Sequence, residues 1–271
     1  QVLKVDKYGD LGTIRLASAI IRLSEMVITP GSYSVMGDGP MRSQTLGAEE
    51  LSNMAFAEDI TRSVSRLPGV ASTDFSSKFT IRGGEDDEVL MTLDGMELYE
   101  PFHQRDFVGG LFSIVDIEAV QSIELLTGGF AADYGDRQSG VFNMTTKTPE
   151  TRRTSFGLSP INARGYTEGT FNNGESNYLF SVRRGMLDKI GLLSVVNDEV
   201  RSSFYDVMGK VEIPVGQKHR LSLHLLGSSD RSEIDEVDEE AREFSDTKFS
   251  NNYGWLRLKS LYADNLYAQT L

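Results

Sequence analysis

The sequence contains no cysteine, which excludes disulfide bonds, thiolate metal sites and a cysteine nucleophile. It also lacks a long apolar run. The best candidate, residues 16–28, is interrupted by Arg22 and Glu25, so no transmembrane helix is expected. The lack of a long apolar run does not exclude a transmembrane β-barrel, because its short alternating strands give a weak hydropathy signal. Basic residues are scarce, with 27 Lys and Arg against 40 Asp and Glu. So acidic a surface repels phosphate backbones, and nucleic-acid binding is not expected.

The usual catalytic and nucleotide-binding motifs are missing as well. No serine lies in a GxSxG elbow, and no GxxxxGK[ST] loop occurs. The three histidines are His103, His219 and His224. The last two lie in one strand-like segment at a spacing that points them to opposite faces. His103 has acidic neighbours, but their spacing is not that of a metal site. We therefore expect no enzymatic activity, no cofactor and no metal.

Glycine and phenylalanine are well represented, with 26 and 14 residues among 271, and this favours a turn-rich β protein. Residues 1–23 alternate apolar and polar, as the last strands of a small β domain do. The chain opens with Gln1 in mid-pattern, so we expect its N-terminus to be truncated, and the missing signal peptide carries no weight. Residues 30–47 are rich in glycine and proline and predict a flexible linker.

Residues 48–147 have the pattern of a compact α+β domain. A helix is predicted to begin at Glu58 and Asp59, to place Ile60, Val64 and Leu67 on one face, and to end at Pro68-Gly69. Glycine-rich turns separate the predicted strands, which are 79–82, 89–93, 122–126 and 141–146.

From Thr154 onward the pattern is one of alternating strands, namely 178–183, 204–213, 221–226 and 253–258. In 204–213 the apolar side chains lie on one face and Asp206, Lys210 and Glu212 lie on the other. Apolar-out, polar-in barrel strands show this pattern, and so does a soluble sandwich. The acidic stretch 230–246 predicts a long solvated loop. Residues 154–271 have room for at most about six spanning strands.

Residues 57–148 resemble the plug domain of TonB-dependent outer-membrane receptors. Five motifs carry the resemblance in order: Asp59-Ile60 through Leu67-Pro68-Gly69-Val70, Phe79–Gly84, Val89–Met96, Ile123–Leu126, and Asp133-Tyr134-Gly135 with Ser139–Lys147. The resemblance implies an α+β plug domain followed by antiparallel strands of an incomplete transmembrane β-barrel. The resemblance implies four segments. Residues 1–23 end a small β-sandwich-like N-terminal extension, and residues 24–47 form a coupling segment and a linker. Residues 48–150 form the plug, and residues 151–271 form barrel strands.

The resemblance implies a receptor in the outer membrane of a Gram-negative bacterium, in contact with its lipid. Such a receptor binds an extracellular ligand above the plug and imports it with energy delivered by TonB. The ligand class stays open among ferric siderophores, cobalamin, glycans and peptides. The alternative is a soluble β-rich adhesion or carbohydrate-binding module. Aromatic girdles would favour the barrel, and the candidates are Phe180, Tyr205, Trp255, Tyr262 and Tyr267.

The segment Ser24–Pro30 resembles the TonB box of the family. A short extended segment of high β-propensity can add an edge strand to the sheet of a partner, and the following linker gives it reach. The expected TonB-coupling residues are Glu25, Met26, Val27, Ile28 and Thr29.

The resemblance also implies an ion-pair lock between plug and barrel. Two plug arginines form it in the family, but Thr127-Gly128-Gly129 stands where the second is usual. Arg82 therefore remains as the candidate, with Glu124 as a possible partner in the same lock. The alternatives are a solvated strand residue for Arg82 and an edge charge for Glu124.

A loop of aromatic and charged residues corresponds to the plug apex, which faces outward in the family. The expected ligand contacts are Phe75, Ser76, Tyr99, Phe102, His103, Gln104 and Arg105. The alternative is that Phe102 and Phe107 pack beneath the barrel wall. Asp94-Gly95 is interpreted as a tight turn and nothing more, and Glu85–Glu88 as a solvated turn.

Overall fold

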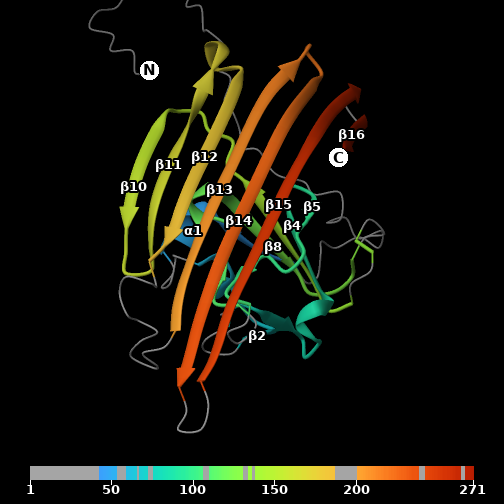
Figure 1. The fold of residues 1–271 in the computed structure, drawn as a ribbon. Coiled ribbons are helices and arrows are strands. Elements are labelled where there is room, and N and C mark those ends of the chain that lie inside the picture. Colours follow the sequence, from blue (N-terminus) through green and yellow to red (C-terminus); the bar gives the residue numbers. More distant parts are fainter. Residues whose placement is uncertain are drawn as a thin grey trace, which may run out of the picture.

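The computed structural model describes residues 43–53, 59–65, 67–72, 76–105, 110–130, 134–135, 138–186, 200–237, 242–263 and 266–271. Two bodies are visible in Figure 1: an N-terminal α+β domain and, in front of it, a large sheet of long strands. Within the described part of the chain, no helix is long and apolar enough to cross a membrane.

The N-terminal domain is built from short elements. Its helices are α1 (Ala48–Asn53) and α2 (Ile60–Val64), with 3₁₀ turns at Asp86–Glu88 and Ile117–Ala119. Its strands are β1 (Ser43–Gly47), β2 (Val70–Ser72), β3 (Phe79–Ile81), β4 (Val89–Leu93), β5 (Met96–Glu97), β6 (Phe102–His103), β7 (Phe112–Ser113), β8 (Val120–Leu126) and β9 (Gly140–Thr146). The predicted strands of this domain are therefore confirmed.

A mixed five-stranded sheet of order β1-β8-β9-β4-β5 forms the centre of this domain. Strands β4 and β9 are parallel, and the other neighbours are antiparallel. Its core contains Ile81, Leu93, Ile123, Phe142 and Met144, all of them fully buried. Strand β1 lies within the range expected to be linker, and its backbone pairs with β8 instead of remaining in solvent.

The helix predicted from Asp59 is present but shorter than expected. The Asp59 carboxylate accepts hydrogen bonds from the backbone N–H groups of Thr61 and Arg62 and so caps α2. The helix ends at Val64, and Leu67 lies beyond it in the turn that Pro68-Gly69 completes. Gly69 adopts a φ of 84°, a conformation that few other residues tolerate.

The second body, called the wall here, is a seven-stranded antiparallel sheet in sequence order. Its strands are β10 (Arg153–Leu158), β11 (Asn162–Phe171), β12 (Ser176–Gly185), β13 (Val200–Val215), β14 (His219–Val237), β15 (Arg242–Ala263) and β16 (Leu266–Thr270). The prediction of at most about six spanning strands is not contradicted, because β10 has six residues and β16 has five, too few to cross a bilayer. Figure 1 shows the N-terminal domain against one face of this sheet, behind β13–β15.

The stretch 230–246 is not a solvated loop. Its described residues, 230–237 and 242–246, continue β14 and β15 in unbroken register, with Asp230 opposite Phe249 and Glu236 opposite Glu243. On the exposed part of this hairpin, Arg231 binds Asp246 through two hydrogen bonds. Composition predicted a loop here, but backbone pairing across the hairpin dominates.

The expected alternation across the wall is confirmed. The face turned away from the N-terminal domain exposes apolar side chains, among them Phe180, Val182, Tyr205, Val207, Val211, Ile213, Leu223, Leu225 and Leu256. The opposite face buries Asp206, Lys210 and Glu212. Tyr262 and Tyr267 are exposed as expected for girdle residues, but Trp255 is buried and stacks on His224, with ring centroids 4.7 Å apart. Trp255 is therefore not a girdle residue.

Candidate functional site: the interface between the N-terminal domain and the wall

Asp94 is the centre of one buried cluster between the two bodies. It occupies the two-residue turn between β4 and β5 with a φ of 51°, followed by Gly95 at 93°. Its carboxylate lies 3.2 Å from Arg257 Nη1 on β15 and 3.3 Å from His224 Nδ1 on β14. The Thr146 hydroxyl donates to the same carboxylate at 2.5 Å. The turn predicted from Asp94-Gly95 is present, but interpreting it as only a turn is wrong.

The Asp94 cluster surrounds a charged carboxylate with wall cations. Burial alone would raise the pKa of Asp94, but the hydrogen bond with His224 and the charges of Lys210 and Arg257 hold that pKa well below its usual range. Lys210 on β13 also donates to the backbone oxygen of Lys147, at 3.2 Å. Three adjacent wall strands therefore bind the end of β4 and the end of β9.

Gly95 lets the wall approach this turn closely. A Cβ atom built at Gly95 would lie 2.7 Å from Leu271 Cδ1 and 3.3 Å from Gln269 Nε2. Its positive φ also favours glycine. A side chain at this position would push apart the turn and the last strand of the wall.

His103 is the centre of a second buried cluster. Its Nε2 lies 2.6 Å from Asp206 Oδ1 on β13, and its Nδ1 lies 3.6 Å from Asp230 Oδ1 on β14. The first distance is a hydrogen bond, while the second is an ion-pair contact beyond hydrogen-bond range. The imidazole stacks on Phe204, with ring centroids 4.3 Å apart.

His103 and Asp94 carry charges of opposite sign. Burial by itself would lower the pKa of His103, but the charge of Asp206, its hydrogen bond and Asp230 together raise that pKa above its ordinary value. Arg183 on β12 also faces this His103 cluster and binds Asp206 at 2.7 Å. At this level, therefore, the N-terminal domain supplies the cation and the wall supplies the carboxylates.

Further polar contacts extend the interface on both sides of His103. The Gln104 backbone N–H donates to Asp230 at 3.1 Å, and Ser232 donates to the Gln104 side chain at 2.5 Å. Toward β10–β12, Asp116 binds Arg164 at 3.1 Å and accepts from Ser181, while Glu118 pairs with Arg153. Most buried side chains of this interface thus have a partner across it, as a stable contact requires.

The residues predicted for the lock lie elsewhere. Arg82 is exposed at the end of β3 with a φ of 53°. Among ion pairs between described residues, none involves Arg82. Glu124 is half-buried in β8, opposite Thr45 and Asn143. The role of Arg82 and Glu124 in a lock stays a prediction.

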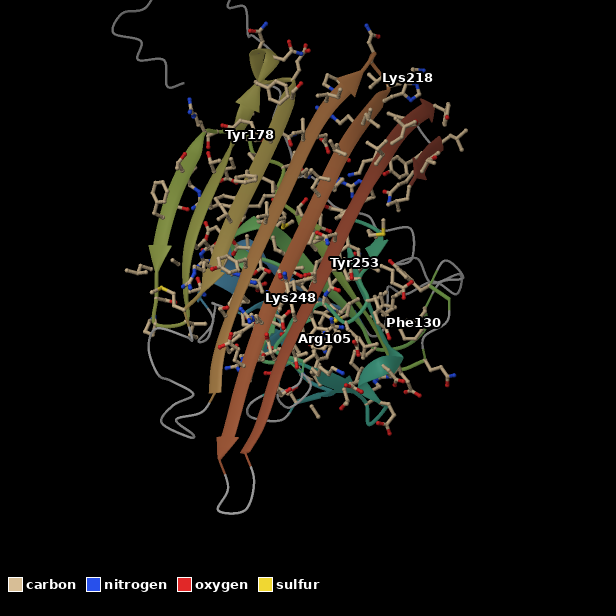
Figure 2. All side chains as sticks on the ribbon, in the orientation of Figure 1. Arg105, Phe130, Tyr178, Lys218, Lys248 and Tyr253 are labelled. Carbon is tan, nitrogen blue, oxygen red and sulfur yellow. The ribbon has the colours of Figure 1, made fainter. Side chains whose placement is uncertain are left out.

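Some of the residues predicted for ligand contact are buried, and others are exposed or partly exposed. Ser76, Phe102, His103 and Gln104 are buried, the last two against the wall. Tyr99 exposes 68% of its surface, and Arg105 lies over the Phe249 ring at 4.3 Å while binding Glu100. Figure 2 shows Arg105 beside the lower part of β14–β15 and Tyr253 higher on the same strands. Phe75 and the coupling residues 25–29 lie outside the described residues.

Sequence reasoning missed the wall side of the interface. A signal was present, because Asp206, Lys210 and His224 interrupt strands whose alternate positions are apolar. A charged residue on the buried face of a strand needs a partner from another element. The spacing of residues along the sequence did not predict that this partner is Asp94 or His103.

Residues 36–141 match the family described as TonB-dependent Receptor Plug Domain. Solved structures of similar fold include the siderophore receptor PirA from Acinetobacter baumannii, at 19% identity and a TM-score of 0.60, covering 82% of this chain and 38% of that one. The outer membrane transporter YddB from Escherichia coli matches at 12% identity and a TM-score of 0.57, over 86% of this chain and 39% of its own.

A ferric enterobactin receptor, PfeA from Pseudomonas aeruginosa, is similar to a comparable extent. It shares 15% identity with a TM-score of 0.59, and the match covers 85% of this chain and 40% of PfeA. The chain thus spans well under half the length of the solved proteins it matches. At these identities the likeness concerns the fold.

Proposed function

We propose that the protein of this chain is an energy-coupled importer of the TonB-dependent receptor family, with the plug as its N-terminal domain and part of the barrel as its wall; the match of residues 36–141 to the plug family and the fold of the wall support this. It works in the outer membrane of a Gram-negative bacterium. An extracellular ligand binds above the plug, TonB engages residues 25–29, and the plug moves so that the ligand passes. No covalent chemistry is involved.

The observation that carries this proposal is the two-sided character of the wall. One face exposes a band of large apolar side chains, whereas the other is polar and filled by the plug. A bilayer stabilises such an apolar band, and antiparallel strands satisfy their backbone hydrogen bonds within the sheet. The alternative, a soluble adhesion or carbohydrate-binding module, leaves this band in water and gives no reason for a domain packed on the polar face.

Ferric siderophores are the first ligand class to test, since PirA and PfeA are siderophore receptors by name. Tyr99 is our leading contact, because its ring is exposed while its backbone is fixed by the wall. Arg105, six residues further along the chain, is the second candidate contact for an anionic ligand, although its guanidinium already binds Glu100 at 2.7 Å. Cobalamin, glycans and peptides stay as alternatives.

The test is an uptake measurement in cells. Cells that produce the whole receptor are expected to accumulate an iron-loaded siderophore, and the receptor is expected in the outer-membrane fraction. Uptake, but not surface binding, is expected to stop in a strain without TonB. Uptake that continues in that strain, or recovery of the receptor only in the soluble fraction, would contradict the proposal.

A further inference from the structure

The Asp94 cluster and the His103 cluster hold the plug to the same wall strands at two levels. On β14, His224 contacts Asp94 and Asp230 contacts His103. Both wall residues face the plug, six positions apart. At about 3.3 Å per residue the two levels are roughly 20 Å apart along the strand.

The two clusters have opposite polarity. At one level a plug carboxylate meets wall cations, and at the other a plug cation meets wall carboxylates. All the side chains that form these contacts are buried: Asp94 and His103 are fully covered, and Arg257 is exposed by only 6%. Sliding the plug along β14 would bring Asp94 toward Asp206 and Asp230, and would strand Arg257 without a partner. Removing one partner of a buried ion pair is strongly unfavourable.

We propose that this pair of opposite ion-pair clusters fixes the closed position of the plug, with Asp94 as its principal anchor in place of Arg82. The inference rests on the proposed transport function, because a plug has a closed position only if it moves. Asp94 is a positioning residue: it binds no ligand, and it holds two plug strand ends, at Leu93 and Thr146, against β14 and β15.

Asp94→Asn isolates the charge, since asparagine tolerates the positive φ at this position and keeps an oxygen for Thr146. Asp59→Asn is the matched control. Asp59 is also a buried plug carboxylate, but it caps α2, its hydrogen bonds stay within the plug, and its charge acts on Arg183 of the wall instead of on the Asp94 cluster. A change common to both variants reports plug stability, whereas a change specific to Asp94→Asn reports anchoring.

The experiment measures ion conductance through the purified whole receptor in a planar bilayer, without ligand and without TonB. The native receptor is expected to stay closed. Asp94→Asn is expected to raise the open-to-closed ratio roughly a hundredfold, the scale for losing one buried ionic partner. Asp59→Asn is expected to raise it far less. Equal conductance in Asp94→Asn and native receptor, or an equal rise in both variants, would overturn the proposal.

Arg257→Gln tests the same pair from the wall, so the conclusion does not depend on one variant. It is expected to raise the open-to-closed ratio to a similar extent, and the Asp94→Asn, Arg257→Gln double variant is expected to fall short of the product of the two single increases. If the increase in the double variant equals the product of the two single increases, the two residues act independently, and the Asp94–Arg257 pair is not the anchor.

The measurement also separates this inference from the proposed function. Loss of TonB-dependent uptake in the native receptor contradicts the function, whatever the conductance. Uptake that is normal while Asp94→Asn remains closed contradicts the anchor alone.

Discussion

The Tyr253 hydroxyl on wall strand β15 binds both backbone polar groups of Tyr99: it accepts from the N–H at 3.1 Å and donates to the carbonyl oxygen at 3.0 Å. One wall side chain thereby fixes the backbone of Tyr99, the most exposed of the predicted ligand contacts that the structure describes. The Tyr99 ring projects from a rigid attachment point, which lowers the entropy that a bound ligand has to offset.

Replacing Tyr253 by Phe is expected to weaken ligand binding about threefold to tenfold, because two modest hydrogen bonds that order Tyr99 are lost. Equilibrium binding of the labelled ligand to cells measures the effect. Tyr178→Phe is the control, since Figure 2 places Tyr178 on β12 toward the opposite end of the wall. Equal affinity in Tyr253→Phe and native receptor would show that the bonds to Tyr99 do not matter for the ligand.

The His103 cluster predicts that plug docking weakens at alkaline pH. The pKa of His103 is raised in the folded protein, so its contribution to stability is full below about pH 6.5, its unfolded value. That contribution is lost as pH rises through the higher folded value. Arg183, which binds Asp206, then still offsets part of the negative charge of the cluster.

Protease resistance of the plug, followed from pH 6 upward in the whole receptor, is the measurement. Resistance is expected to fall with rising pH in the native receptor. His103→Gln is expected to be less resistant at low pH and to lose most of the pH dependence. His219→Gln serves as the control, because His219 contacts Ser260 within the wall. An unchanged pH profile in His103→Gln would assign the dependence to another group.

The outer face of the wall predicts a depth-dependent response to charge. Leu225→Arg, at the seventh of the 19 residues of β14 and among its exposed apolar side chains, is expected to destabilise a bilayer-embedded barrel by about 2–4 kcal/mol. Val215→Arg, at the end of β13, is expected to cost at most about 1 kcal/mol. Both native side chains are apolar and about half exposed, so they form a matched pair.

Denaturant unfolding of the whole receptor in lipid vesicles gives the two free energies. In a soluble module, both exposed positions would accept arginine with changes within about 0.5 kcal/mol. Two small and equal effects would therefore favour the adhesion alternative over the barrel.

The coupling segment gives a prediction that follows from the sequence alone. Val27→Pro or Ile28→Pro removes a backbone N–H and is expected to prevent edge pairing with TonB. Uptake is expected to be abolished while ligand still binds at the cell surface. Ser34→Pro, in the expected linker, is the control and is expected to transport normally. Normal uptake in both coupling variants would exclude this segment from the mechanism.

The order of motifs along residues 57–148 was sufficient to predict the plug and the strands after it, because each motif is local. An Asp-capped helix, the Asp94-Gly95 turn and alternating strands depend on neighbours a few residues away. The local pattern failed at 230–246, where composition suggested a loop. Cross-strand hydrogen bonds with β15 decided the structure there, and they involve residues that composition does not pair.

The sequence by itself determined which residues of the wall are charged on the face opposite the apolar side chains. Only the tertiary structure decided which plug residue meets each of them. Asp94 and Arg257 are 163 residues apart, and His103 and Asp206 are 103 apart. Such pairs form only when the two bodies pack against each other in one register. The burial that makes these charges decisive is a property of the docked state, and no spacing within either segment encodes it.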